Sequence, residues 1–144
     1  MAERIDFINA VMVRMEALAD FKVTSGYGGV HLGAAPHDDA EKFPYLVVNL
    51  QASPGPEYNT GTEQVDIWPV LFNVYATDAE TAAGAIESIE ADLEGTALAP
   101  ASGSALATHV GSSLVDLDPD RDAEGEEIWH ATVLVEFTMQ RTLT

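Results

Sequence analysis

The stretch "VDIWPVLFNVYATDAETAAGAIESIEADLEG", residues 65–95, decides the fold because it begins as a strand and continues as a helix. Its first part alternates apolar with other side chains, which is the period of a strand with one buried face. The apolar set of this strand is Val70, Phe72, Val74 and Ala76. Thr77 and Glu80 fit a capping box at the start of a helix, and Gly95 fits its end. The apolar stripe of that helix is Ala82, Ile86, Ile89 and Leu93.

Pro69 interrupts the strand. Before the proline, the apolar side of the alternation falls on Val65 and Ile67, so the parity changes by one residue. A one-residue change predicts a β-bulge, and proline is tolerated in sheets at bulges or on edges. We therefore expect a long, bent strand that is exposed on one edge for part of its length.

The flanking sequence predicts a second helix and three further strands. Apolar residues recur at helical spacing near the N-terminus, and clean alternation of a strand returns near the C-terminus. The expected elements are a helix at 3–20, a strand in "YLVVNLQA" after Pro44, and strands at 109–117 and 126–142. The sequence thus predicts an α+β fold in which a mostly antiparallel β-sheet carries two α-helices packed on one face, within a single domain, 1–144.

Three connecting segments are rich in glycine, proline or small residues. Residues 21–43 predict either a mobile loop or a loosely paired hairpin, with a short strand at 30–32. Residues 53–63 predict a loop too long for a tight hairpin turn, and residues 96–108 predict a connector.

The charge balance limits the partners of the chain. It has 24 acidic and 6 basic residues, a formal net charge of -18. Because DNA and anionic membranes are bound chiefly through Lys and Arg, tight binding to either is not expected. Solubility or a salty habitat would explain the acidity equally well. There are no cysteines, which excludes disulfides, thiolate nucleophiles and cysteine-ligated metals. No apolar run approaches the roughly 18–20 residues of a membrane span, and "MAERIDF" does not resemble a secretory signal, so synthesis inside the cell is expected.

An acidic segment between the last two strands raises the question of a metal site. Its carboxylates alternate as in a calcium-binding loop. The EF-hand pattern, however, needs Gly after the third acidic position and Glu at the twelfth. A loop that starts at Asp116 lacks the Gly, and a loop that starts at Asp118 lacks both residues. We interpret the segment as a projecting hairpin tip that faces solvent, a lumen or a partner. Its acidic residues are Asp116, Asp118, Asp120, Asp122 and Glu124.

Motifs for catalysis are weak. "GYGGVHLG" lacks the spacing of a phosphate-binding loop, and no Gly-x-Ser-x-Gly elbow occurs. The four histidines form no metal-binding pair, so we expect no catalytic residue, no metal and no cofactor. The alternative from another class is a small metal-dependent enzyme that uses His37, Asp38 and Asp39.

Aromatic residues near loops and strand ends are the remaining surface signal. Such residues are often ordinary core or rim residues, but oligomer interfaces also favour them. Tyr58 and Trp68 are the candidates for an oligomer interface, and Tyr27 and Tyr45 lie in similar positions.

In layout, the chain resembles the tail terminator (tail-completion, minor tail protein U-like) proteins of long-tailed bacteriophages. The resemblance rests on "FPYLVVNL", on "VYATDAETA" between the long strand and the second helix, and on the closing "WHATVLVEFTMQR". It covers nearly the whole chain.

The resemblance implies a structural virion protein without enzymatic activity, made in the host cytoplasm and located in the tail or neck. Its copies would form a homo-hexamer ring that caps the tail tube protein and meets the head–tail connector proteins. DNA would pass through the ring without tight binding, and acidic side chains facing the lumen would suit this passage. A head-closure or head-completion neck protein is the nearest structural alternative.

Overall fold

The computed structural model describes residues 2–33, 42–50, 56–59, 63–93, 97–98, 104–110, 114–117 and 128–142. Two α-helices, two short 3-10 turns and eight strands occur within these ranges. The helical elements are α1 (Ala2–Glu16), η1 (Ala19–Phe21), η2 (Val23–Ser25) and α2 (Ala79–Leu93). The strands are β1 (Gly29–Leu32), β2 (Tyr45–Leu50), β3 (Pro56–Asn59), β4 (Glu63–Ala76), β5 (Ala97–Leu98), β6 (Ser104–Val110), β7 (Leu114–Leu117) and β8 (Trp129–Thr142).

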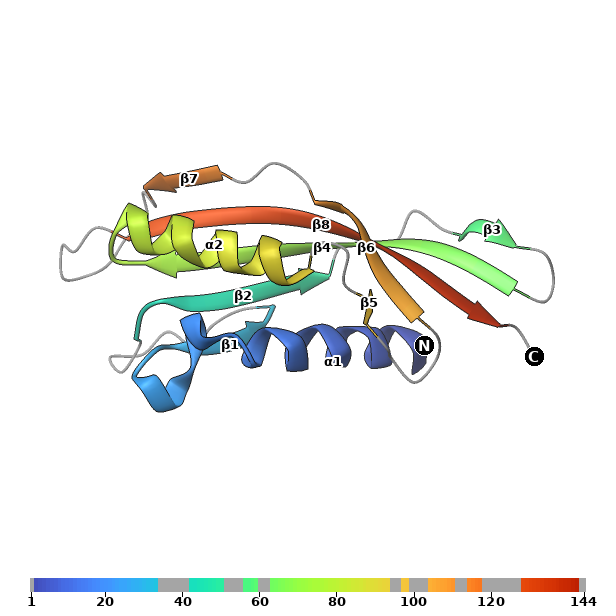
Figure 1. Ribbon diagram of the computed structural model, residues 1–144, viewed down its shortest axis with the longest axis horizontal. Helices are drawn as coiled ribbons and strands as arrows, with labels where there is room; N and C mark the ends of the chain where they lie inside the picture. The colour runs from blue at the N-terminus through green and yellow to red at the C-terminus, as the bar shows by residue number, and fades with distance from the viewer. Residues whose placement is uncertain are drawn as a thin grey trace.

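The strands form one sheet that is built around β4 and β8. These two strands pair antiparallel from Glu63↔Thr142 to Ala76↔Trp129 without a break, and they run side by side along the molecule (Figure 1). The main strand order is β1-β2-β4-β8-β6-β5, with β3 on the outer side of β4 and β7 on the outer side of β8. All pairings are antiparallel except β1 with β2.

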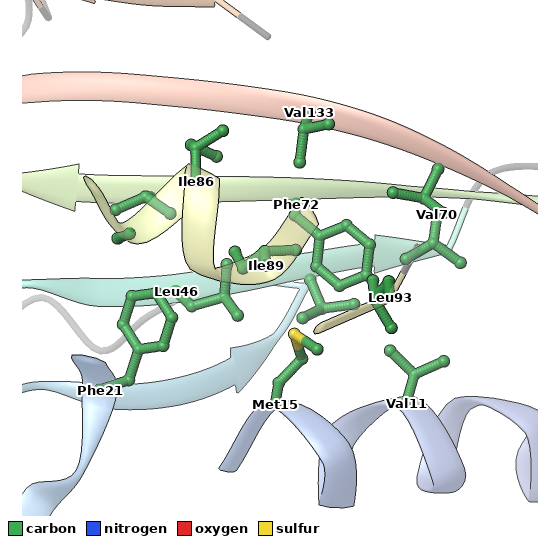
Figure 2. Packing of buried hydrophobic residues seen from close by; sticks show 14 of the residues in the cluster. Val11, Met15, Phe21, Leu46, Val70, Phe72, Ile86, Ile89, Leu93 and Val133 are labelled. Atoms are coloured by element: carbon green, nitrogen blue, oxygen red, sulfur yellow. The ribbon is translucent and has the colours of Figure 1, made fainter. Parts of the chain in front are cut away.

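The hydrophobic core lies between one face of the sheet and both helices. Val70, Phe72 and Val74 of β4 are fully buried, and alternate residues of β2 and β8 join them. Figure 2 shows side chains from α1, α2 and three strands pointing into this common space. The helix residues buried there are Phe7, Ile8, Val11 and Met15 of α1 and Ala82, Ala85, Ile86, Ile89 and Leu93 of α2. The expected α+β fold, with two helices on one face of a mostly antiparallel sheet, is confirmed.

The bulge expected at Pro69 is wrong. The register between β4 and β8 is unbroken through Pro69↔Glu136, and Trp68 has the same parity as Val70 and lies in the same core. On its other side, β4 pairs with β2 as far as Val70 and with β3 from Asp66, and residues 51–55, which join β2 to β3, lie outside the described residues. The exposed edge expected along this part of β4 stays a prediction.

Several element boundaries also differ from the sequence expectation. Helix α1 ends at Glu16 instead of residue 20, and its Phe7 is fully buried. The segment 53–63 contains β3, and the expected connector 96–108 contains β5 and the start of β6. The short strand at 30–32 is present as β1, which pairs parallel to β2, and residues 34–41, which the hairpin alternative would need, lie outside the described residues.

Helix α2 begins one residue later than the capping box predicted. Asp78, and not Thr77, is the capping side chain: its Oδ1 accepts a hydrogen bond from the Thr81 backbone N–H at 2.7 Å, and its Oδ2 accepts one from the Thr81 hydroxyl at 2.9 Å. These two bonds, the backbone one first, lower the pKa of Asp78 below its ordinary value because they favour the charged carboxylate. The predicted end at Gly95 lies outside the described residues.

Gly28, just before β1, is required by close backbone contact. A Cβ added there would collide with the carbonyl oxygen of Lys42 and would lie 2.7 Å from the Cβ of Tyr45. The next residue, Gly29, has φ +83°, a backbone conformation that side chains rarely adopt. The glycine-rich segment, which we interpreted as flexible, therefore allows β1 to lie close to the start of β2.

Candidate interaction face and sheet edges

The face of the sheet that carries no helix has its own packed cluster. Alternation along each strand sends the residues between the core positions to this side. Tyr45 and Val47 of β2 are buried there at 7% and 6% exposure, with Phe43 and Tyr75 packed against them. We call this surface the helix-free face. The sheet therefore buries apolar side chains on both sides over β2 and β4, although helices cover only one side.

A row of rings crosses four strands on the helix-free face. The register aligns Tyr45 of β2, Tyr75 of β4 and His130 of β8. Tyr45 and Tyr75 stack with ring centroids 5.0 Å apart, and Tyr75 and His130 stack at 4.5 Å with their planes within 4°. His31 of β1 approaches Tyr45 edge-on at 6.1 Å. Such ring pairs stabilise neighbouring strands beyond the area that they bury.

A buried amide fixes the orientation of the histidine in this row. Asn73 is 6% exposed, and its Nδ2 donates to the carbonyl oxygen of Val47 at 3.4 Å. Its Oδ1 must then accept from His130 Nε2 at 2.9 Å, so that nitrogen carries a proton. His31 Nε2 likewise donates to the carbonyl oxygen of Gly28 at 2.8 Å. At these atoms, both imidazoles act as hydrogen-bond donors that hold strands and turns in place.

Only some of the predicted site residues lie within the described residues. Trp68 is 4% exposed and packs edge-on against Phe7 with centroids 4.9 Å apart, so of its two interpretations the structure favours the core one. Tyr58 lies on β3, where its backbone pairs with Val65 of β4. Asp116 lies on β7, where its backbone pairs with His130. The other acidic-tip residues, Asp118, Asp120, Asp122 and Glu124, lie outside the described residues, as do His37, Asp38 and Asp39.

Two properties of the described residues bear on function. Among them, no group of three or more His, Asp or Glu side chains is placed to hold a metal ion. In the same part of the chain, neither helix has the length and apolar character that a bilayer span requires.

The ring row on the helix-free face was missed by sequence reasoning. Its residues stand between the core positions, where Asn73, Tyr75 and His130 look like ordinary outward-facing residues. The sequence shows the alternation of β4 and β8. It does not show the register that stacks Tyr75 on His130 and aligns Tyr45 with both. His130 is partly buried and hydrogen-bonded to Asn73.

Charge is unevenly distributed along the chain. Residues 21–33 and 42–50, which form η2, β1, β2 and the turns around them, contain both lysines of the chain, and residues 34–41 between them contain Asp38, Asp39 and Glu41. Lys22 and Lys42 are both exposed. Helix α2, in contrast, has four acidic residues and no basic one.

Comparison with known proteins finds similarity in structure but not in sequence families. A chain in the virion of a native gene transfer agent particle aligns with a TM-score of 0.58 at 14% identity, over 90% of this chain and 90% of that one. A second solved structure aligns with a TM-score of 0.52 at 9% identity, over 96% of this chain and 93% of that one. No family model and no curated protein matches the sequence. At these identities the alignments establish a shared fold.

Proposed function

We propose that this chain is a structural protein of a phage-like virion, and that its copies form a ring that terminates the tail tube and joins the tail to the head-side connector. The observation that carries the proposal is the likeness to a chain of the gene transfer agent virion over nearly the full length of both. The tail terminator resemblance of the sequence, which also covers nearly the whole chain, points to the same class of particle. The ring, its six copies and its place in the neck come from that resemblance.

The mechanism in this proposal is geometric and involves no bond-making or bond-breaking. A ring on the end of a tube blocks further addition of tube subunits and offers a new surface to the connector. Ring closure also covers free strand edges, which otherwise promote uncontrolled association. The net charge of -18 fits passage of DNA through the ring, because an acidic lumen repels the phosphate backbone. Asp118, Asp120 and Asp122 would line this passage.

Removing the gene from a particle-producing strain tests the proposal. A terminator that stops polymerisation should leave tails of uncontrolled length that lack heads when it is missing, as seen by electron microscopy. Supplying the wild-type chain should restore uniform tails. Tails of normal length, beside heads that have lost their DNA, would contradict the terminator role and favour the head-closure alternative. Unchanged particles would contradict both.

Two further measurements address the acidic tip and the enzyme alternative. Reversing the charges of Asp118, Asp120 and Asp122 together should impair assembly or DNA passage, and normal infectious particles would refute the lumen hypothesis. For the enzyme alternative, His37→Ala with Asp38→Ala and Asp39→Ala should leave particle assembly intact. Stoichiometric metal that is lost in this triple variant would instead support an enzyme.

A further inference from the structure

Strands β1 and β7 are the two lateral edges of one half of the sheet. In this half the strand order is β1-β2-β4-β8-β7, and in Figure 1 β7 and β1 lie at opposite margins. Each has four residues, and among the described residues each pairs on one side only. An unpaired edge presents a row of backbone N–H and C=O groups that can pair with another strand.

The two edges lie at the same height on the sheet. The row through Tyr45, Tyr75 and His130 begins at Gly29 of β1 and ends at Asp116 of β7. Two rows further along, the same register links His31 of β1 to Leu114 of β7. The two strands therefore span the same three rows. If the neighbouring copy is related by rotation alone, without a shift along the strands, its β7 lies opposite β1 of the first copy.

The strand directions are compatible with pairing. Since β1 is parallel to β2, and each step from β2 through β4 and β8 to β7 is antiparallel, β1 and β7 run in opposite directions. When copies stand side by side around an axis that runs roughly along the strands, β1 of one copy meets β7 of the next as an antiparallel pair. Antiparallel pairing is slightly more stable per residue than parallel pairing.

The surroundings of β1 combine lysines with exposed apolar side chains. Lys22 and Lys42 are exposed, and the backbone of Lys42 contacts Gly28 at the start of β1, while Asp38, Asp39 and Glu41 precede Lys42 in the sequence. Val23 and Leu32 nearby are exposed by 69% and 53%. The β7 edge of a second copy carries Asp116 as its one charged residue, on the row of Gly29.

We infer that the β1 edge of one copy pairs with the β7 edge of the next, so that sheets join laterally around the ring. The inference rests on the proposed ring, because a contact between two different edges is heterologous and closes only by rotation. It names the surface through which copies meet. Elsewhere, copies with a charge of -18 repel each other.

Cysteine trapping tests the register of this contact. The chain has no cysteine of its own, so His31→Cys with Leu114→Cys places the only two thiols on one row of the inferred pair. Facing residues of antiparallel strands lie within reach of a disulfide. Oxidation should give a ladder of linked copies that ends at the closed ring on non-reducing gels. The control is Val13→Cys with Leu114→Cys, which pairs β7 with an exposed residue of α1.

Each single-cysteine variant should give dimers only at the rate of random collision. Mixing the His31→Cys chain with the Leu114→Cys chain should give a heterodimer that grows no further. A double variant that melts like the wild type yet forms no more linked species than the Val13 control would overturn the inference.

Charge reversal tests the same contact without cysteines. Lys22→Glu with Lys42→Glu disables the β1 edge, and Asp116→Lys disables the β7 edge, all at exposed or edge positions. Each variant alone should associate roughly fivefold to tenfold more weakly at low salt, as expected for losing one or two partly screened charge pairs. A mixture of the two should form a 1:1 dimer through the one edge that each retains. Wild-type association of either variant, or no dimer in the mixture, would overturn the inference.

Failure of this inference is distinguishable from failure of the proposed function. Rings that form without β1–β7 links, in a strain that needs the protein for uniform tails, would refute the edge assignment alone. Linked rings from a protein whose loss leaves tails unchanged would refute the proposed function alone.

Discussion

The two faces of the sheet are built from the same strands but follow different rules. On the helix-covered face, every described position of β4 from Trp68 to Ala76 is apolar and at most 4% exposed. On the helix-free face, the intervening positions include Leu71, Asn73 and Tyr75, which are half-buried or buried and pair with Leu134, Thr132 and His130 of β8. One face is held by burial against helices, and the other by ring stacking and a buried amide.

The difference shows what each kind of stabilisation requires. Burial against helices depends on volume and hydrophobicity, so any set of apolar side chains of the right size would serve. The helix-free face depends on register, because Asn73 can reach both the Val47 carbonyl and His130 only when β2, β4 and β8 are aligned as observed. We expect the first face to determine how stable the fold is and the second to keep the strand pairing unique.

The largest loss of stability should come from removing a large side chain from the helix-covered face. Phe72→Ala removes a fully buried ring from the centre of the core, and we expect it to lower the free energy of unfolding by about 3–5 kcal/mol. Leu71→Ala, one residue away and half-buried on the other face, should lower it by about 1 kcal/mol. Urea unfolding measures both. Equal losses would mean that the two faces contribute alike.

A smaller effect should come from the buried amide on the helix-free face. Asn73→Ala leaves the carbonyl oxygen of Val47 and the Nε2–H of His130 without this partner, and we expect a loss of about 1–3 kcal/mol. The matched control is Asn49→Ala, on the same face of β2 and half-buried, which should change stability by less than about 0.5 kcal/mol. If the two substitutions were equivalent, the amide would have no special role in the register.

Sequence reasoning predicted the helix-covered face well and the helix-free face poorly, for a physical reason. Alternation and helical spacing identify the buried set directly, so Phe72, Ile86 and Val133 were all assigned correctly to apolar faces. Register is a relation between segments far apart in the chain, such as Tyr75 and His130, and no local pattern encodes it. The same limit explains the error at Pro69, since its unbroken pairing with Glu136 is set by the register of β4 against β8.

The cap of α2 offers a pH test of the helix that covers the sheet. The lowered pKa of Asp78 means that its contribution is fully present above the pKa of the unfolded chain and is lost as the pH falls through the folded value. Asp78→Ala should therefore lower the melting temperature by a few degrees at pH 7. The difference from wild type should shrink from about pH 4 downward.

The control for this cap is Asp78→Asn, whose side-chain oxygen still accepts a bond from the Thr81 N–H. It should retain most of the melting temperature and show a much weaker dependence on pH. A difference between Asp78→Ala and wild type that stayed constant down to pH 2 would show that the charge of Asp78 plays no part.

The smallest effect should come from the ion pair that joins the two helices above the core. Arg14 Nε of α1 donates to Asp92 Oδ2 of α2 at 2.8 Å, and this bond raises the pKa of Arg14. Because the arginine side chain is 42% exposed, water and salt screen the pair, and a double-mutant cycle with Arg14→Ala and Asp92→Ala should give a coupling of about 0.2–1 kcal/mol. Raising the salt to about 1 M should reduce it further. A coupling of several kcal/mol that resists salt would mean that the helices are held on the sheet by charge as much as by burial, and the contrast between the two faces would then need a different explanation.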